Sequence, residues 1–295
     1  MVTLMGKCKP LIGVVHLPPL PGSPGYRVRR WPPGAGRRWS IEDIVEYAVS
    51  EARSYVESGF DAVIVENYGD TPYPKRPTPL QVAAMARVVS EVVRAIGGGR
   101  VGVNMLRNGA AEAIAVAVAS GAGFVRVNSL CETRLTPEGL IEPEAQRVAW
   151  ALRAVDALDD APIQVLADVD VKHSYPLAKY SVKEAVKDCI ERSGVPLAAV
   201  IVTGSATGEE ATPVDVEEAA SAARPYGVAV VVGSGVSTAN LPRYWHSADG
   251  FIVGSSVKVG GVPWNPVDRE KASALAALAS QYRRFSEECE GGDEE

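Results

Sequence analysis

Short runs of apolar residues recur along the chain and alternate with longer stretches rich in alanine, glutamate and arginine. The runs hold mostly valine, isoleucine and leucine and few polar residues. That pattern is typical of parallel strands that are buried on both faces. We predict eight strands: Leu11–His16, Asp61–Glu66, Arg100–Met105, Phe124–Asn128, Ile163–Asp168, Ala198–Thr203, Val228–Gly233 and Gly250–Val253.

The stretches between the runs have the composition and length of helices. Ser40 with Asp43, and Ser181 with Glu184, resemble capping boxes at two helix starts. We predict helices over Ile41–Glu57, Pro79–Ile96, Ala110–Ser120, Glu142–Leu158, Val182–Arg192, Val214–Ala223 and Asp268–Phe285, with a short one near Thr238–Tyr244.

Eight alternating strand and helix units predict an α/β fold, a single-domain (β/α)8 TIM barrel over residues 1–286. The 295 residues of the chain suit one such barrel. An open, doubly wound sheet is the alternative, but no GxGxxG motif follows the first predicted strand.

Negative charge is concentrated at the end of the chain. The formal net charge is −6, and residues 287–295 hold six acidic residues and no basic one, so the rest is close to neutral. We predict that 287–295 form an acidic disordered tail. The lack of a broad basic field argues against a nucleic-acid partner. No segment approaches the roughly 20 apolar residues that a bilayer span needs.

Four cysteines are scattered without a CxxC or zinc spacing: Cys8, Cys131, Cys189 and Cys289. We predict that they are reduced thiols in a cytoplasmic protein, since we see no signal peptide. Asparagine and glutamine are scarce, which hints at a heat-adapted source. Barrels of this kind are commonly dimers or larger, so we expect a homo-oligomer.

Polar residues gather at and just after the C-terminal ends of several predicted strands, and the N-terminal ends show no similar cluster. In a barrel, the C-terminal strand ends and the loops after them build the active site. We therefore predict a small-molecule site there, with substrate-binding side chains at Asn104, Asn128, Arg126, Asp70 and Thr203.

The densest polar cluster follows the fifth predicted strand and comprises Asp168, Asp170, Lys172 and His173. If the chain stays extended, period-two alternation places the first three on one side. Asp168, Lys172 and His173 are candidate catalytic residues, because a carboxylate beside a lysine and a histidine can move protons or act as a nucleophile. A Schiff-base lysine is a further alternative. A strand end whose charges merely satisfy one another would have the same sequence.

His16 and Glu66 end the first two strands and are further catalytic candidates. A core histidine bonded to backbone is the structural alternative for His16. Glu66 has no obvious partner in the sequence, and a buried lone carboxylate is costly. With Asp168 these two could hold a divalent cation, although no metal-binding spacing supports it. The sequence requires no cofactor.

Small residues follow the last two strands, and this gives the sharpest prediction. They let backbone N–H groups approach an anion, and barrels often bind phosphate at these two loops. Because both loops carry the pattern, we predict a phosphate site and a small phosphorylated ligand. Its residues are Gly233, Ser234, Gly235, Gly254, Ser255 and Ser256.

The loop over residues 17–39 holds five arginines between positions 27 and 38, among prolines and glycines. A loop this long in a compact domain is usually functional or disordered. It could be a lid whose arginines meet an anionic substrate, or a solvated insertion or subunit contact. The segment from Thr203 to Gly208 is a further candidate substrate-facing loop.

Ordered blocks of the chain resemble the BtpA/SgcQ family. They include HLPPLPGSP from His16, ENYGD from Glu66, GVNMLRN from Gly102, ADVDVKH from Ala167, TGSATG from Thr203 and DGFIVG from Asp249. The resemblance runs from about Leu11 to Arg284 and implies a fold similar to ribulose-phosphate-binding barrels. Founding members of the family are associated with photosystem I biogenesis at thylakoid membranes. The resemblance therefore also implies peripheral contact with a membrane as one kind of partner. The arginine-rich stretch and the acidic tail depart from the usual pattern.

Two function classes follow. One is an enzyme, a lyase, isomerase or hydrolase, that acts on a small phosphorylated, sugar-phosphate-like metabolite. The other is a non-catalytic assembly or biogenesis factor that uses its surface, whose signature would be a large exposed apolar patch.

Overall fold

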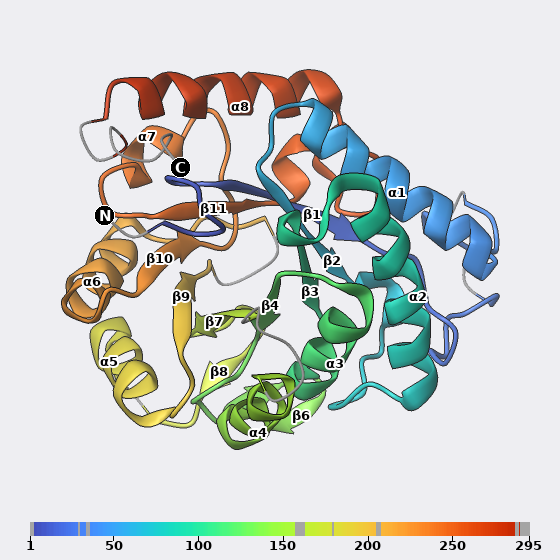
Figure 1. Cartoon of the computed structure of the whole chain (residues 1–295), viewed down its shortest axis with the longest axis horizontal. Coiled ribbons are helices and arrows are strands. Elements are labelled where there is room, and N and C mark those ends of the chain that lie inside the picture. The colour runs from blue at the N-terminus through green and yellow to red at the C-terminus, as the bar shows by residue number, and fades with distance from the viewer. Residues whose placement is uncertain are drawn as a thin grey trace.

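The computed structural model describes residues 3–28, 30–33, 36–156, 163–178, 180–204, 208–286 and 289. Eight parallel strands close into a barrel in the order β1-β11-β10-β9-β7-β4-β3-β2, with the helices outside it (Figure 1). The predicted TIM barrel is therefore confirmed, and the open sheet is excluded. The barrel strands are β1 Leu11–His16, β2 Ala62–Glu66, β3 Val101–Asn104, β4 Phe124–Val127, β7 Gln164–Val169, β9 Leu197–Val202, β10 Ala229–Val232 and β11 Gly250–Val253.

The helices follow the predicted pattern closely. Ser40 and Ser181 both form the predicted capping boxes, which satisfy N–H groups at the starts of α1 and α5. No helix of the described residues is long and apolar enough to cross a membrane. The helices are α1 Ile41–Glu57, α2 Pro79–Ile96, α3 Ala110–Ser120, α4 Ala145–Asp156, α5 Val182–Arg192, α6 Pro213–Ala223, α7 Leu241–Tyr244 and α8 Arg269–Arg284.

A small antiparallel sheet on the barrel loops was not predicted. It consists of β5 Arg134–Thr136, β6 Gly139–Ile141 and β8 Tyr175–Pro176, in the order β6-β5-β8. Strands of two or three residues are too short to show a period in the sequence. Because β6 ends at Ile141, helix α4 begins at Ala145 and not at the predicted Glu142. Leu158, its predicted end, lies outside the described residues.

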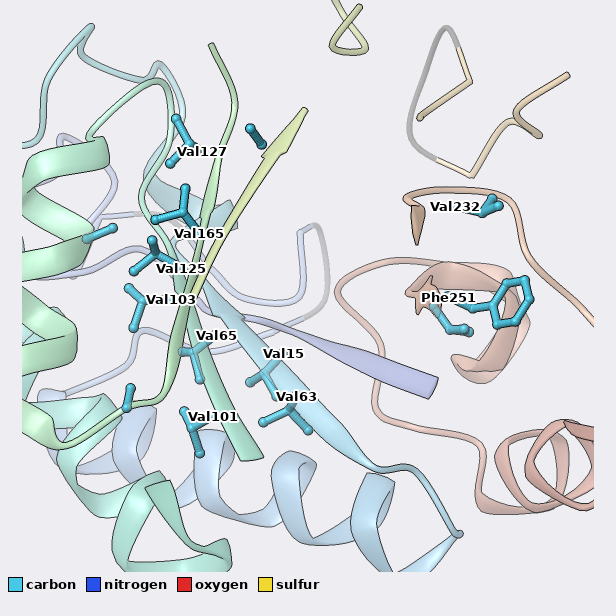
Figure 2. Close-up of a cluster of buried hydrophobic side chains, with 14 of the residues drawn as sticks. Val15, Val63, Val65, Val101, Val103, Val125, Val127, Val165, Val232 and Phe251 are labelled. Atoms are coloured by element: carbon cyan, nitrogen blue, oxygen red, sulfur yellow. The ribbon is translucent and has the colours of Figure 1, made fainter. Parts of the chain in front are cut away.

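Alternating strand residues build two apolar layers. Figure 2 shows Val15, Val65, Val103 and Val125 in the layer that packs between the strands and the helices. The residues before them in each strand point into the barrel, where Ile12, Ile64, Phe124, Leu166 and Ile201 belong to a separate buried cluster. This period of two fixes which strand-end residues can face the barrel mouth.

Two disulfide bonds contradict the prediction of reduced thiols. Cys8 pairs with Cys289 and Cys131 with Cys189, with Cα atoms 5.7 Å and 5.4 Å apart. The partners are 281 and 58 residues apart in sequence, so local spacing could not reveal them. The thiol argument for a cytoplasmic location is therefore lost. Cys289 is also the only residue of the predicted tail 287–295 that the structure describes.

We expect thiol titration of the denatured, unreduced protein to find no free thiol. The paired variant Cys131→Ala with Cys189→Ala should lower the free energy of unfolding by about 2–4 kcal/mol, since the bond restricts the unfolded chain. Urea denaturation with and without reductant measures this. Four free thiols, or no change in stability on reduction, would contradict the pairing.

Candidate functional site

The inward-facing series of each strand continues into its polar end. In β1, for example, Ile12 and Val14 point into the barrel, and His16 is the next residue of the same parity. Pairing places His16 opposite Glu66, Glu66 opposite Asn104, and Asn104 opposite Arg126. Four predicted site residues therefore form one row across β1, β2, β3 and β4 at the mouth of the barrel.

The other side of the mouth carries small residues. Thr203, Gly233 and Gly254 follow Ile201, Val231 and Ile252 at the same parity in β9, β10 and β11. A β-carbon on Gly233 would lie 2.4 Å from Ile201 Cγ2, so only glycine fits there. The mouth of the barrel is thus lined by polar side chains at β1 to β4 and by small residues at β9 to β11.

A cavity joins these two sides. It brings catalytic candidates and the predicted phosphate loops together, and it has a volume of about 30 Å³. A larger surface groove, between α1 and α2, contains no strand-end residue. The cavity at the mouth is lined by Val14, His16, Glu66, Tyr68, Arg126, Lys172, Gly208, Gly233, Ser234, Gly235, Gly254, Ser255 and Ser256.

Arg126 is held at the cavity by a buried ion pair with Asp168. Arg126 Nη2 lies 3.0 Å from Asp168 Oδ1, and Nε donates to both carboxylate oxygens at 3.2 Å. Asn128 Nδ2 donates to Oδ2 of the same carboxylate at 2.7 Å. The Arg126 and Asp168 side chains are 2% and 0% exposed. Asp168 thus orients the Arg126 guanidinium. Arg126 Nη1 donates to none of the described residues.

Glu66 and Lys172 both stay available for chemistry in the cavity. Asn104 Nδ2 donates to Glu66 Oε2 at 2.8 Å, whereas Glu66 Oε1 has no hydrogen-bond partner among the described residues. The Lys172 ammonium makes no hydrogen bond or ion pair within the same part of the chain. Burial and the neighbouring Arg126 guanidinium lower the pKa of Lys172 to about 8.

The expectation of an extended chain through Asp170 is wrong. Asp170 and His173 have left-handed backbones, with φ of 53° and 56°, so the chain turns after β7. Asp170 is thereby carried away from the cavity to an ion pair with Arg134. His173 is exposed and does not line the cavity. Of the cluster, only Lys172 reaches it, and the backbone N–H of Lys172 donates to Thr203 Oγ1 at 3.1 Å.

His16 is buried, with 4% of its surface exposed. Burial, together with the positive charges of Lys258 and Lys172, lowers the pKa of His16 well below its ordinary value. The imidazole is therefore neutral at pH 7. Its Nδ1 has no hydrogen-bond partner among the described residues. A neutral imidazole with a free nitrogen can exchange a hydrogen bond with a ligand.

The two predicted phosphate loops meet at the cavity. Ser234 accepts from the Gly204 N–H at 2.8 Å and donates to the Glu209 carbonyl at 2.8 Å, so its hydroxyl fixes the loop after β9. Gly235 has φ of 72°, and a β-carbon there would lie 2.6 Å from the Glu209 oxygen. Ser255 and Ser256 open a 3-10 turn at Ser255–Val257, so the turn leaves their backbone N–H groups unused.

Two predicted site residues have structural partners instead. Asp70 is fully buried and accepts from the Leu20 N–H and from Gln81 Nε2, each at 2.7 Å, and so ties the first loop to α2. Burial raises the pKa of Asp70. Thr203 is occupied by the Lys172 backbone, as above. Asn104 and Asn128 each retain an amide oxygen without a partner in the described part of the chain.

The donor set does not fit the metal hypothesis on His16, Glu66 and Asp168. Both Asp168 oxygens face Arg126 and Asn128. No group of three His, Cys, Asp or Glu residues within the described ranges could hold an ion. Sequence reasoning also missed Tyr68 as a cavity wall, although it stands two residues after Glu66. The predicted loop segment 205–207 lies outside the described residues.

Lys258, which directly follows the second predicted phosphate loop, is fully buried and forms an ion pair with Glu51 of α1. Glu51 Oε1 also accepts from the Val267 N–H at 3.0 Å. This pair ties the loop after β11 to the helix layer. Lys258 therefore supports the loop from beneath and does not line the cavity.

The fold and the site define a TIM-barrel protein whose C-terminal face holds a cavity lined by the side chains of Arg126 and Lys172 and by glycines. The chain belongs to the BtpA family, whose model matches residues 7–281. The family resemblance predicted from the sequence blocks is thus confirmed.

Relatives cover almost the whole chain. An uncharacterized protein of Pyrococcus horikoshii is 43% identical over 93% of this chain and 97% of its own length. The photosystem I biogenesis protein BtpA of Synechocystis is 37% identical over 90% of this chain and 86% of its own. Among solved structures, 3-hexulose-6-phosphate synthase covers 91% of this chain and 99% of that one, with a TM-score of 0.53 and 16% identity. That last likeness shows the fold alone.

Proposed function

We propose that this protein is an enzyme that binds a small phosphorylated metabolite and transfers a proton on it. One observation carries the proposal: a single cavity joins two cations, a carboxylate and the two glycine-containing loops. Loops after the last two strands are a common place for phosphate in TIM barrels. Arg126 and Lys172 would supply the positive charge.

In this proposal Glu66 is the general base, since its Oε1 is unoccupied and Asn104 fixes the other oxygen. Lys172 and Arg126 stabilise the negative charge that develops as the proton leaves. The amide oxygens of Asn104 and Asn128 accept from hydroxyl groups of the ligand. This machinery serves lyases, isomerases and hydrolases of sugar-phosphate-like compounds.

In this proposal Asp168 and His173, two of the predicted catalytic residues, do not take part in proton transfer. Asp168 is occupied by Arg126, and His173 lies outside the cavity, so neither is placed to abstract the proton. Asp168 becomes a positioning residue. Its pairing keeps the Arg126 side chain turned toward the ligand.

The test is thermal unfolding with inorganic phosphate, ribose 5-phosphate and unphosphorylated ribose, each with and without Mg²⁺. A ligand at 100 times its Kd stabilises the native state by about 2.7 kcal/mol, which raises Tm by several degrees. We expect ribose 5-phosphate and phosphate to raise Tm and ribose to leave it unchanged. No shift with any phosphate compound would refute the proposal.

Gly235→Ala is expected to remove this stabilisation by phosphate. The new methyl group would meet the Glu209 and Glu210 backbone, and the positive φ adds about 1–3 kcal/mol of strain. Gly194→Ala is the matched control, because Gly194 also has positive φ (65°) but a β-carbon there meets nothing within 4 Å. Equal losses of phosphate binding in both variants would mean that strain, and not the loop, is responsible.

A non-catalytic assembly role is the second candidate, and the name of the Synechocystis relative suggests it. The observation that favours it is an exposed apolar row across the small sheet, where Leu135 pairs with Leu140 and with Tyr175. We expect Leu135→Asp to leave phosphate binding unchanged. If the protein acts through this surface, Leu135→Asp rather than Glu66→Gln should abolish pull-down of a partner complex.

A further inference from the structure

A second pocket opens beside the phosphate cavity and is walled by aromatic rings. It has a volume of about 460 Å³. Trp31 comes from the loop after β1, Tyr68 and Tyr73 from the segment after β2, and Trp264 from the loop after β11. We call the cavity between these four rings the aromatic pocket.

The rings hold one another in place. The Trp31 centroid lies 6.3 Å from that of Trp264 and 6.4 Å from that of Tyr68, both in edge-on geometry. Tyr73 Oη donates to the Tyr68 carbonyl at 2.7 Å, and Trp39 Nε1 donates to the Trp31 carbonyl at 2.8 Å. The walls are therefore fixed before any ligand arrives, which lowers the entropic cost of binding.

The two pockets share a wall. Tyr68 lines both, and its ring contacts the His16 ring at 4.7 Å between centroids. The phosphate cavity, at about 30 Å³, is far too small for a whole metabolite, whereas the aromatic pocket lies in the 300–1,000 Å³ range of small-molecule sites. A ligand with its phosphate at the loops would extend past Tyr68 into the aromatic pocket.

The chemistry of the aromatic pocket favours a planar ring. Indole and phenol faces stack on flat heterocycles, and each stacked base contributes about a 5- to 150-fold gain in affinity. Among the described residues that line the pocket, Arg30 is the only charged one, so no carboxylate there repels the phosphate end of a ligand. Trp31 Nε1 is buried without an acceptor in the part of the chain described, which leaves one ring donor unsatisfied.

We propose, resting on the phosphate site proposed above, that the ligand is nucleotide-like. It is a phosphate monoester whose other end is a planar heterocycle, as in a nucleoside 5′-monophosphate. The loops after β10 and β11 hold the phosphate, and the aromatic pocket holds the base. The sugar between them passes Tyr68, beside Glu66 and Lys172.

The test compares AMP, UMP, ribose 5-phosphate and adenosine by isothermal titration calorimetry, with quenching of tryptophan fluorescence as a second readout. We expect at least one nucleotide to bind at least 10-fold more tightly than ribose 5-phosphate. Trp264→Leu should erase that advantage and leave the Kd of ribose 5-phosphate unchanged, and Trp264→Phe should restore part of it. Trp150→Leu is the matched control, because Trp150 is 74% exposed on α4.

The outcomes separate the two proposals. If ribose 5-phosphate binds as tightly as both nucleotides, or if Trp264→Leu weakens all three equally, the nucleotide-like ligand is refuted while the phosphate site stands. If adenosine binds through Trp264 as tightly as AMP and ribose 5-phosphate does not bind, the phosphate site is refuted and only the aromatic pocket remains. If nothing binds, both proposals fail.

Discussion

Asp168→Ala is expected to lower the free energy of unfolding by about 3–5 kcal/mol, because it leaves the Arg126 charge buried and unpaired. Both side chains are almost fully buried, and three Arg126–Asp168 hydrogen bonds would be lost together with the one from Asn128. Chemical denaturation at pH 7 measures the loss.

Two variants make this prediction specific. Asp188→Ala is the control, since Asp188 is exposed on α5, and its effect should stay within about 0.5 kcal/mol. The double variant Arg126→Met with Asp168→Leu should recover most of the stability, because apolar residues replace both buried charges. It should not recover phosphate binding. A loss below 1 kcal/mol for Asp168→Ala would mean that water or a rearranged partner relieves Arg126.

The same variant also separates two roles for Asp168, a catalytic carboxylate and a residue that positions Arg126. Loss of activity in Asp168→Ala would by itself suggest a catalytic carboxylate. The geometry attributes the loss to the release of Arg126. Asp168→Asn should therefore bind ribose 5-phosphate more weakly than the wild type but not lose binding. Glu66→Gln, in contrast, should keep binding and lose turnover. A split between binding and kcat distinguishes the positioning residue from the base.

Much of the site could be predicted because a strand has a period of two. Once a run of apolar residues is recognised as a barrel strand, the parity of Val14 or Ile64 requires that His16 and Glu66 face the mouth. The same rule identifies Gly233 and Gly254 as the small residues of the opposite wall. These inferences need only local sequence and the closure of the barrel.

The parts that failed depend on the chain path beyond the strand. The left-handed backbones at Asp170 and His173 separate residues that alternation would have grouped with Lys172. Two disulfides and the Arg126–Asp168 pair join residues that are 42 to 281 positions apart. Such contacts arise from folding and leave no spacing in the sequence. The aromatic pocket, assembled from three loops, was unpredictable for the same reason.

The affinity of the wild-type protein for ribose 5-phosphate is expected to fall as pH rises through about 8. Lys172 has a pKa of about 8 in the free protein, so it carries a full charge well below that pH and loses the charge above it. A phosphate monoester is already a dianion across pH 7.5–9.5, and His16 is neutral throughout because its pKa is lowered. The fall, at most tenfold per pH unit, therefore reports Lys172.

Lys172→Met is expected to weaken ribose 5-phosphate binding by about 10- to 100-fold at pH 7, the worth of one charge-assisted hydrogen bond. Its remaining affinity should change little between pH 7.5 and 9.5. Lys172→Arg keeps its charge over that range, so its affinity should also be flat, at a level closer to wild type. Calorimetric titrations at four pH values provide the data. If Lys172→Arg loses affinity with pH as steeply as wild type, the titrating group lies elsewhere, and the buried Lys258 beneath the loop after β11 becomes the alternative source.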